Sequence, residues 1–430
     1  MANGNVEGIK EIKHPGWRVT FAGMGINLAL GILYTWSVIS EGIPEEWGWN
    51  ESDKSWPYSV ACLVFCLIMV PAGRLQDKMG PALTATIGGI LVGLGFILAS
   101  MTSSLVGFIM AFGVLAGAGI GFGYASATPP AVKWFPPART GMIAGLVVSG
   151  FGLASVYAAP LAKWLMVEFG FKIMLLSLGI AFLVLISGLR SIWYLLYQGL
   201  AHMLESPSKD YVPQVVVKKK SVHDKDNLTP SEMLNTWQFY VLWFMYACGA
   251  GAGLMIIGKL AAIAGQEKIG ISIGFVLVAV LAVGNGAGRI IAGIFSDMIG
   301  RKATMLICFL SQALFIFLLS RASSDNIFGT VPVMCVISAL IGANYGANLA
   351  LFPSITKDFY GAKNFGMNYG LVFTAWGFGG FLLSKLAGWM YDKHDSFNIA
   401  YFGASGLLIL AAILVFILKE PKHLENNVTK

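Results

Sequence analysis

The most regular feature of this sequence is a series of long charge-free stretches separated by short polar segments. In the first half, stretches without Asp, Glu, Lys or Arg cover residues 19–40, 55–73, 79–132, 140–162 and 173–189. In the second half they cover residues 233–258, 269–288, 303–320, 326–356, 364–384 and 396–418. A helix that crosses a membrane needs about 20 such residues. Because residues 79–132 are long enough for two helices, with a break near Thr102–Ser104, the pattern predicts twelve spanning helices, six in each half.

The composition agrees with a membrane protein and excludes two other classes. Of the 430 residues, 56% are apolar and 12% are charged, whereas soluble proteins carry about 25% charged residues. A water-soluble enzyme with one buried core is therefore excluded, and so is intrinsic disorder, because disordered chains are poor in apolar residues. All five cysteines lie in apolar stretches and predict no disulfide framework. Cys62 and Cys66 stand one helical turn apart, and we interpret them as small packing residues rather than as ligands of a soft metal.

The distribution of charge predicts the orientation of the chain, because cytoplasmic loops are enriched in Lys and Arg. With the N-terminus inside, 20 of the 29 Lys and Arg residues fall on the cytoplasmic side and six fall outside. The remaining three, Lys259, Arg289 and Lys385, lie within spans or at their edges. We therefore expect both termini in the cytoplasm of a cell whose inner membrane holds the protein. The net charge of +7 and the Lys218–Lys220 run are interpreted as features of cytoplasmic loops, and nucleic acid is not an expected partner.

The two halves carry the same short sequence motifs at matching positions. The motif G-x-x-x-D-x-x-G-[P/R] follows the second predicted helix and the eighth, and its two copies are the following residues: Gly73, Asp77, Gly80 and Pro81; Gly293, Asp297, Gly300 and Arg301. A second pair of similar segments, Lys133–Gly141 and Lys357–Gly366, follows the fourth and tenth helices. Glycine allows two helices to approach closely, and the aspartate is suited to cap a neighbouring helix N-terminus. We expect these residues to form gates without touching substrate.

This internal repeat predicts the domain organisation. Two six-helix repeats joined by a long cytoplasmic loop are the layout of the major facilitator superfamily. The expected units are an N-terminal six-helix bundle at residues 1–197, a linker at residues 198–236 and a C-terminal six-helix bundle at residues 237–430. The fold class is an all-α membrane protein, most simply a monomer in the lipid bilayer.

Arg289 is the strongest candidate for substrate chemistry. No Asp or Glu lies in the middle of a span, and every histidine lies in a loop or tail (His14, His202, His223, His394 and His423). A charge at this depth needs a wet cavity or a partner, and a guanidinium matches a carboxylate through two parallel hydrogen bonds. We favour Arg289 as the anchor of an anionic substrate, although a structural arginine bonded to backbone carbonyls is the alternative.

Four further side chains join Arg289 as candidates for the site. Asn285 lies one turn earlier on the same helix face, where it faces the arginine or a substrate hydroxyl, or else joins two helices. Tyr124 and Tyr345 lie in glycine-rich helices, in which glycine is expected to make room for their hydroxyls, and Tyr34 lies in the first span. For all three tyrosines, packing between helices is the alternative.

Two lysines lie near the outer ends of predicted spans. Lys385 either reaches the site from the outer side or extends to the membrane interface. Lys259 is expected to extend to the interface.

At this point the chain resembles the monocarboxylate transporter family of the major facilitator superfamily, especially its bacterial lactate-transporting homologues, and it is similar to the bacterial oxalate/formate antiporter. The motifs that carry the resemblance are Tyr34–Ser37, Trp134–Pro136, Asn285–Arg289, Leu351–Ser354 and Asn368–Gly370. The resemblance implies that Arg289 anchors the carboxylate and that Tyr34, Tyr124 and Tyr345 line the cavity.

The chain departs from these relatives at three positions. Animal members carry an aspartate where Asn285 stands and a lysine where Val38 stands, so their scheme for proton relay does not transfer directly. The antiporter carries a lysine where this chain has Trp376. Lys385 does not replace that lysine, because nine residues at 100° each bring it to the opposite helix face. Two central cations suit a dicarboxylate, whereas one cation beside a tryptophan suits a monocarboxylate with an apolar body.

The sequence therefore predicts a secondary transporter of small monocarboxylates such as L-lactate, coupled to protons and working by alternating access. The alternative in the same class is an oxalate/formate-type anion antiporter. An anion channel is disfavoured by the repeated gate motifs. An enzyme is not expected, because no acid–base group lies at depth, and no cofactor or metal is expected either.

Overall fold

The computed structural model describes residues 15–49, 51–187, 200–207, 227–266, 271–323, 326–394 and 396–421. In the first half the elements are α1 (Gly16–Leu30), η1 (Gly31–Thr35), α2 (Trp36–Glu41), η2 (Glu45–Trp47), α3 (Glu51–Met79), α4 (Pro81–Ser100), α5 (Leu105–Phe108), η3 (Ile109–Ala116), α6 (Gly117–Lys133), η4 (Pro137–Arg139), α7 (Thr140–Phe169), α8 (Phe171–Phe182) and η5 (Leu183–Ser187). In the second half they are η6 (Leu200–Met203), α9 (Pro230–Leu234), α10 (Trp237–Gln266), α11 (Ile271–Ile299), α12 (Arg301–Leu319), η7 (Ile327–Gly329), α13 (Val331–Tyr360), α14 (Phe365–His394) and α15 (Asn398–Ile417).

The described residues form eleven helices that are long and apolar enough to cross a membrane, together with a shorter apolar helix at Phe171–Ser187. This shorter helix corresponds to the sixth predicted span, at residues 173–189, and its last residue is also the last described residue before a gap that ends at residue 200. Large apolar side chains such as Val167, Met298 and Phe416 are more than 60% exposed on the outside of the helices. That surface suits contact with lipid rather than with water.

Local irregularities interrupt two of the spans. The first span tightens to a 3-10 turn at η1, just where Tyr34 lies, and continues as α2. The fourth span passes through a wider π-type segment at η3 before it becomes α6. Such departures from α-helical geometry often lie near functional sites, and in both spans the irregular segment adjoins a tyrosine-bearing stretch.

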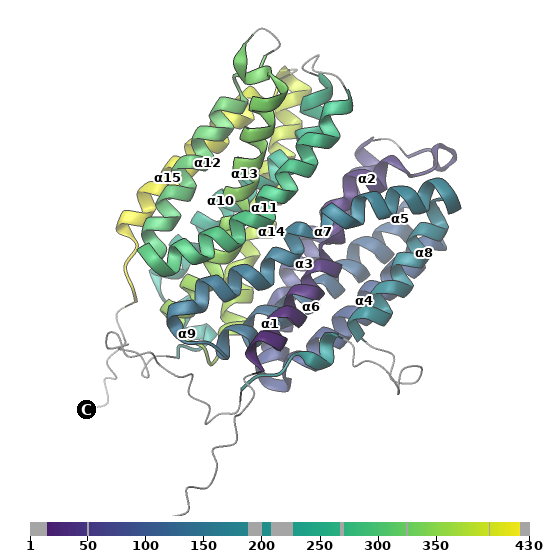
Figure 1. Cartoon of the computed structure of the whole chain (residues 1–430). Helices are drawn as coiled ribbons and strands as arrows, with labels where there is room; N and C mark the ends of the chain where they lie inside the picture. The colour runs from purple at the N-terminus through teal and green to yellow at the C-terminus, as the bar shows by residue number, and fades with distance from the viewer. Residues whose placement is uncertain are drawn as a thin grey trace, which may run out of the picture.

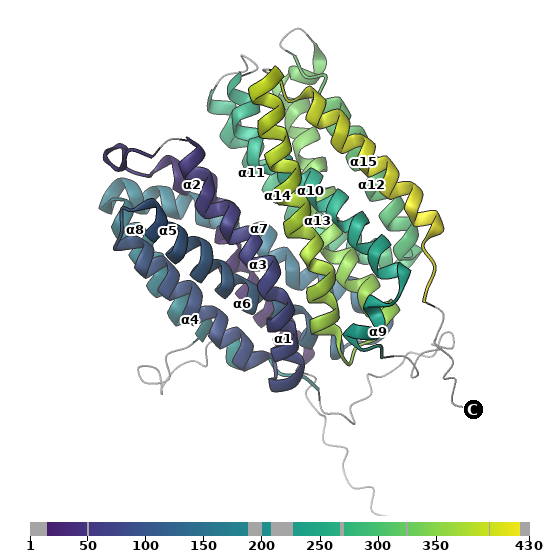
Figure 2. The same ribbon diagram turned by 180° about the vertical axis from the view of Figure 1, so that it is seen from behind.

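The helices form two bundles that lie side by side (Figure 1). The first contains α1 to α8 and the second contains α10 to α15. Helix α7 packs against α11, and α3 packs against α14 (Figure 2). The interface between the bundles is therefore built from two pairs of long helices, and the candidate site lies between them.

Two parts of the segment between the bundles are described, residues 200–207 and residues 227–236. Next to the first bundle, Arg18 forms an ion pair of 2.6 Å with Glu205, whose carbonyl accepts a hydrogen bond from the Trp134 indole. Next to the second bundle, the Leu228 amide donates to the carbonyl of Tyr360. The predicted boundary at residue 197 and the Lys218–Lys220 run lie outside the described residues, as do His14, His223 and His423.

Candidate functional site

Arg289 is completely buried in α11, about 15 Å from the end of that helix at 1.5 Å per residue. Its Nε donates to the Asn285 side-chain oxygen at 3.0 Å. Its Nη1 donates to the backbone carbonyl of Val148 in α7, which belongs to the other bundle. Its Nη2 is buried and has no hydrogen-bond partner among the described residues. The structure therefore shows the bond to a backbone carbonyl that the second interpretation expected, and the role of Arg289 as a substrate anchor stays a prediction.

Close approach of α7 and α11 creates this arrangement. A Cβ atom on Gly145 would collide with the carbonyl of Arg289. The glycines of the other tyrosine-bearing helices act in the same way, because a Cβ on Gly121 would meet the Phe65 carbonyl and one on Gly346 would meet the Asn285 carbonyl. The expectation that glycine leaves open room around the tyrosines is wrong: neighbouring helix backbones occupy that room.

A narrow space opens beside Arg289. It is lined by the following eight residues: Tyr34, Phe65, Tyr124, Phe151, Arg289, Leu349, Phe373 and Trp376. In this conformation its side chains leave no room for a water molecule. Among the described residues that line it, Arg289 alone is charged, so the space combines one cation, hydroxyls and aromatic surface.

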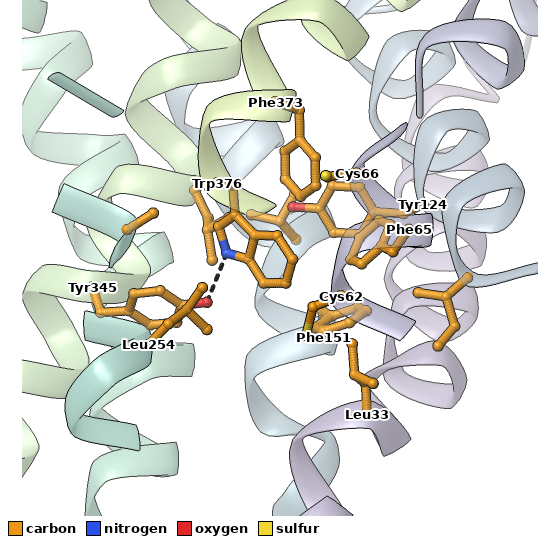
Figure 3. Packing of buried hydrophobic residues seen from close by; sticks show 14 of the residues in the cluster. Leu33, Cys62, Phe65, Cys66, Tyr124, Phe151, Leu254, Tyr345, Phe373 and Trp376 are labelled. Atoms are coloured by element: carbon orange, nitrogen blue, oxygen red, sulfur yellow. Dashed lines mark hydrogen bonds between the residues drawn. The ribbon is translucent and has the colours of Figure 1, made fainter. Parts of the chain in front are cut away.

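Tyr34 and Tyr345 close this space from one side by joining the two bundles. Their hydroxyls share a hydrogen bond of 2.5 Å. The Trp376 indole nitrogen donates to the same Tyr345 hydroxyl at 2.9 Å (Figure 3). Tyr345 is fully buried. It does not line the space itself, but it contacts Tyr34 and Trp376, which do. The structure thus brings Arg289, Asn285, Tyr34, Tyr124 and Tyr345 together.

Lys385 is not brought to this group. It is exposed, and its ammonium lies 5.8 Å from the Trp56 ring centroid and 5.3 Å from that of Phe381. This geometry matches the interpretation in which the lysine extends along apolar surface. The side chain of Lys259 lies outside the described residues.

The Asp77 carboxylate caps the first turn of α14, as expected from the sequence. It accepts the backbone N–H groups of Gly366 at 3.2 Å and Met367 at 3.0 Å. The helices meet closely there, because a Cβ on Gly73 would collide with the Gly366 carbonyl. Lys133 is the nearby cation, at 4.0 Å from Asp77.

The second copy of the motif makes the equivalent contact with α7. Asp297 accepts the N–H groups of Gly141 at 3.0 Å and Met142 at 2.8 Å. Arg301 adds an ion pair with Asp297 and another with Asp358, the latter at 2.7 Å. Each motif therefore joins one bundle to the other at the same end of the molecule, which we call the motif end.

Both motifs turn at a glycine. Gly80 and Gly300 have φ angles of +94° and +95°, a region that side chains with a Cβ rarely adopt.

Several residues of the site were not predicted. Phe65, Phe151, Leu349 and Phe373 line the space, but an apolar residue in an apolar span carries no sequence signal. Trp376 entered only through the comparison with the antiporter. The Val148 acceptor is a backbone carbonyl. Every residue has one, so the residue type gives no sign of its role.

Comparison with known proteins places this geometry in a family. The model of the Major Facilitator Superfamily matches residues 19–285 and 242–430. The oxalate:formate antiporter of Oxalobacter formigenes is 29% identical over 84% of this chain and 82% of its own. An uncharacterised MFS-type transporter of Escherichia coli is 26% identical over 84% of this chain and 85% of its own. Human monocarboxylate transporter 11 is 24% identical over 94% of this chain and 82% of its own.

Solved structures share the fold. The human organic anion transporter MFSD10 superposes with a TM-score of 0.69 at 13% identity, over 93% of this chain and 99% of that one. The proton:xylose symporter XylE gives a TM-score of 0.67 at 14% identity, over 95% of this chain and 96% of that one.

Proposed function

The chain belongs to the Major Facilitator Superfamily, and from this premise we propose that it transports a small monocarboxylate such as L-lactate across the cell membrane. The transport is by proton symport with alternating access. The motif end and both termini face the cytoplasm, and the protein works as a monomer in the inner membrane.

The observation that carries this proposal is the buried Nη2 of Arg289, which makes no hydrogen bond of good geometry to a described residue. An ionised guanidinium surrounded by neutral groups lacks a counter-charge, which is costly at membrane depth. The cavity walls supply hydroxyls and aromatic rings but no acid among the described lining residues. A carboxylate that enters supplies the missing negative charge and accepts charge-assisted hydrogen bonds.

The contacts between bundles suggest how binding is linked to movement. Arg289 in the second bundle holds the Val148 carbonyl of the first. A carboxylate that takes over this nitrogen replaces a bond between the bundles by a bond to substrate. On the other side of the space, the Tyr34–Tyr345 hydrogen bond must break before substrate enters. Binding therefore exchanges contacts that fix one arrangement of the bundles, which is the differential interaction that a conformational change requires.

We infer proton coupling from the net charge of the species that crosses the membrane. A carboxylate that leaves Arg289 exposes a buried cation, and a proton that moves with the anion makes the transported species neutral. Apart from Arg289, the described residues that line the space include no carboxylate, lysine or histidine. We therefore infer that the substrate carboxylate carries the proton: it is the anion while it pairs with Arg289 and takes up the proton when that contact breaks.

The alternative function is exchange of oxalate and formate. It is favoured by the 29% identity to the oxalate:formate antiporter. The fully buried Trp376 weighs against it, because this aromatic wall fits the apolar body of a monocarboxylate better than a second carboxylate.

Competition in vesicles tests the proposal. Purified protein reconstituted into liposomes should take up labelled L-lactate, and unlabelled pyruvate should compete more strongly than oxalate. Stronger competition by oxalate than by pyruvate would favour the antiporter, and no uptake of any of these acids would reject both functions.

A further inference from the structure

The part of the linker that precedes the second bundle is fastened to the start of α14. The Leu228 carbonyl accepts hydrogen bonds from the side-chain amides of Asn364 and Asn368, each at 3.1 Å. Asn368 is completely buried, and it belongs to the Asn368–Gly370 motif, which has no part in the transport scheme above. We call residues 227–236 of the linker the strap.

Further hydrogen bonds fix the strap in this position. The Asn227 side-chain oxygen accepts the backbone N–H of Lys363 at 2.8 Å, directly before α14. Within the strap, Thr229 and Glu232 form a reciprocal cap on the short helix α9: the Thr229 amide donates to the Glu232 carboxylate at 2.7 Å, and the Glu232 amide donates to the Thr229 hydroxyl at 3.3 Å. The strap therefore has a defined conformation of its own and a defined place against α14.

The strap holds the residue that is placed to cap α14 locally. Asn364 is the N-cap of this helix, because its carbonyl accepts the first helical hydrogen bond, from the Asn368 amide at 3.0 Å. Asparagine is a preferred N-cap residue, since its side-chain oxygen can accept the N–H of the second or third helical residue. In α14 these are Gly366 and Met367, and both donate instead to Asp77 of the other bundle.

Capping by Asn364 and capping by Asp77 compete, because each backbone amide has one hydrogen to donate. The hydrogen bond from Asn364 to the Leu228 carbonyl turns the asparagine side chain toward the strap. An asparagine released from the strap is able to turn back and accept the amides of its own helix. Those amides would then be lost to Asp77, whose bonds to them join the two bundles.

The equivalent joint of the other motif copy lacks this competitor. Helix α7 has Arg139 at its N-cap, with no hydrogen bond from that side chain to the helix. Its second and third residues, Gly141 and Met142, donate to Asp297. An arginine side chain has no acceptor atom, so it cannot take these amides from the aspartate. Of the two joints, the one at α14 is therefore the one that its own N-cap residue can disconnect.

We propose that the strap is a conformational switch for the motif end. While it is attached, it holds Asn364 aside and reserves the start of α14 for Asp77, which keeps this end closed. When it detaches, Asn364 caps its own helix, Asp77 loses both partners, and the bundles separate more readily at this end. The inference goes beyond the proposed function, because it holds whichever acid the protein carries.

The test follows opening in purified protein, through the labelling rate of a cysteine introduced at Thr128, which is 1% exposed. Two variants weaken the strap: Asn227→Ala removes an exposed acceptor, and Asn368→Leu keeps the size of the side chain but removes the donor. Each is measured with and without Asn364→Ala, which removes the competing cap. The matched control is Asn235→Ala, because Asn235 is an exposed asparagine of the same segment, at the end of α9. Size-exclusion elution and melting temperature verify that each variant folds.

Each strap variant should raise the labelling rate about threefold to tenfold, as expected when one hydrogen bond is lost. Adding Asn364→Ala should return the rate to within about twofold of the wild type. Asn364→Ala alone and Asn235→Ala should leave the rate unchanged.

An increase that persists after Asn364→Ala is added would mean that the strap only supports the helix, and this result would overturn the switch. An increase in Asn364→Ala alone that equals the increase in the strap variants would overturn it as well, since this asparagine would then be only a fastening residue. No increase in either strap variant would show that the strap does not control this end. Because Asn227 is exposed, its variant decides the matter even if Asn368→Leu fails to fold.

Discussion

At the scale of single residues, the three nitrogens of the Arg289 guanidinium differ in their hydrogen bonds. Nε is held by Asn285 and Nη1 by the Val148 carbonyl, whereas Nη2 makes no hydrogen bond of good geometry to a described residue. A lysine keeps the charge but replaces this planar fork by a single ammonium. Neither the orientation by Asn285 nor a two-point contact with a carboxylate survives that change.

We therefore expect Arg289→Lys to weaken lactate binding by roughly tenfold to a hundredfold, since hydrogen bonds to charged groups contribute about 1.5–3 kcal/mol. The measurement is the lactate concentration that raises the melting temperature of the purified protein. Arg321→Lys is the control, because that exposed guanidinium lies over the Phe317 and Phe402 rings, far along the chain from the site. Equal lactate affinity in Arg289→Lys and wild type would remove the arginine from the site.

Trp376 tests the choice between one and two cations. Trp376→Lys should shift preference toward dicarboxylates, because it adds a second cation to the residues that line the same space as Arg289. Competition by oxalate against lactate uptake is the measurement. Trp376→Phe is the control, since it removes the hydrogen bond to Tyr345 without adding charge. If oxalate competes no better in the lysine variant than in the phenylalanine variant, the argument from two cations is incorrect.

The sequence identified the polar part of this site and missed the apolar part. Arg289 was conspicuous as a charge within an apolar span, and Asn285 followed from its position one turn earlier. Phe65 and Phe373 look like any other core residue in a membrane protein, so only the packing of helices from both halves reveals their role.

At the scale of helices, the two motif copies make equivalent contacts, but the aspartate of the second copy is held more firmly by neighbouring cations than that of the first. Asp297 is paired with Arg301, which also reaches Asp358. Among the described residues, Lys133 is the cation near Asp77, at 4.0 Å, because Pro81 occupies the position that corresponds to Arg301.

We expect Asp77→Ala to open the motif end, because it removes two hydrogen bonds that cap α14. Loss of a cap costs about 1–2 kcal/mol, which changes the equilibrium between closed and open forms by about 5- to 30-fold. A cysteine introduced at Thr128, which is 1% exposed in this arrangement, reports opening through its rate of labelling in site-resolved mass spectrometry. Glu205→Gln is the control, because its ion pair with Arg18 is exposed and lies beside the first bundle, away from the second. Equal labelling rates in Asp77→Ala and the control would mean that the cap does not hold this end closed.

The helices themselves were largely predictable from the charge-free stretches. Spans such as α4 and α15 begin and end within a few residues of their predicted limits. The 3-10 turn at η1 and the π-type segment at η3 were not predictable, because hydrophobicity reports burial in lipid and not the local number of residues per turn.

At the scale of the whole molecule, the buried charge of Arg289 takes part in the contact between the two bundles. The cation lies in one bundle and its backbone acceptor in the other, so the charge state of the site is linked to the contact between bundles. The proton that accompanies the anion is expected to travel on the substrate, because Lys385 is exposed beside Trp56 and Phe381 and does not line the space.

Lys385→Ala should therefore leave gradient-driven accumulation of lactate within about twofold of the wild-type level, as expected for a surface substitution away from the site. Accumulation under an inward acid gradient is the measurement. Lys393→Ala is the matched control, since Lys393 is also exposed and lies over a tryptophan ring, that of Trp389 at 5.2 Å. Loss of accumulation in Lys385→Ala alone would make this lysine the proton carrier.

The central claim is that a monocarboxylate held by Arg289 moves together with a proton. The most direct measurement is accumulation of labelled L-lactate in proteoliposomes under an inward acid gradient, for wild type, Arg289→Lys and protein-free vesicles. We expect accumulation by the wild type alone, and we expect a protonophore to abolish it. Uptake that ignores the gradient but is stimulated by oxalate or formate inside the vesicles would contradict symport and establish exchange in its place.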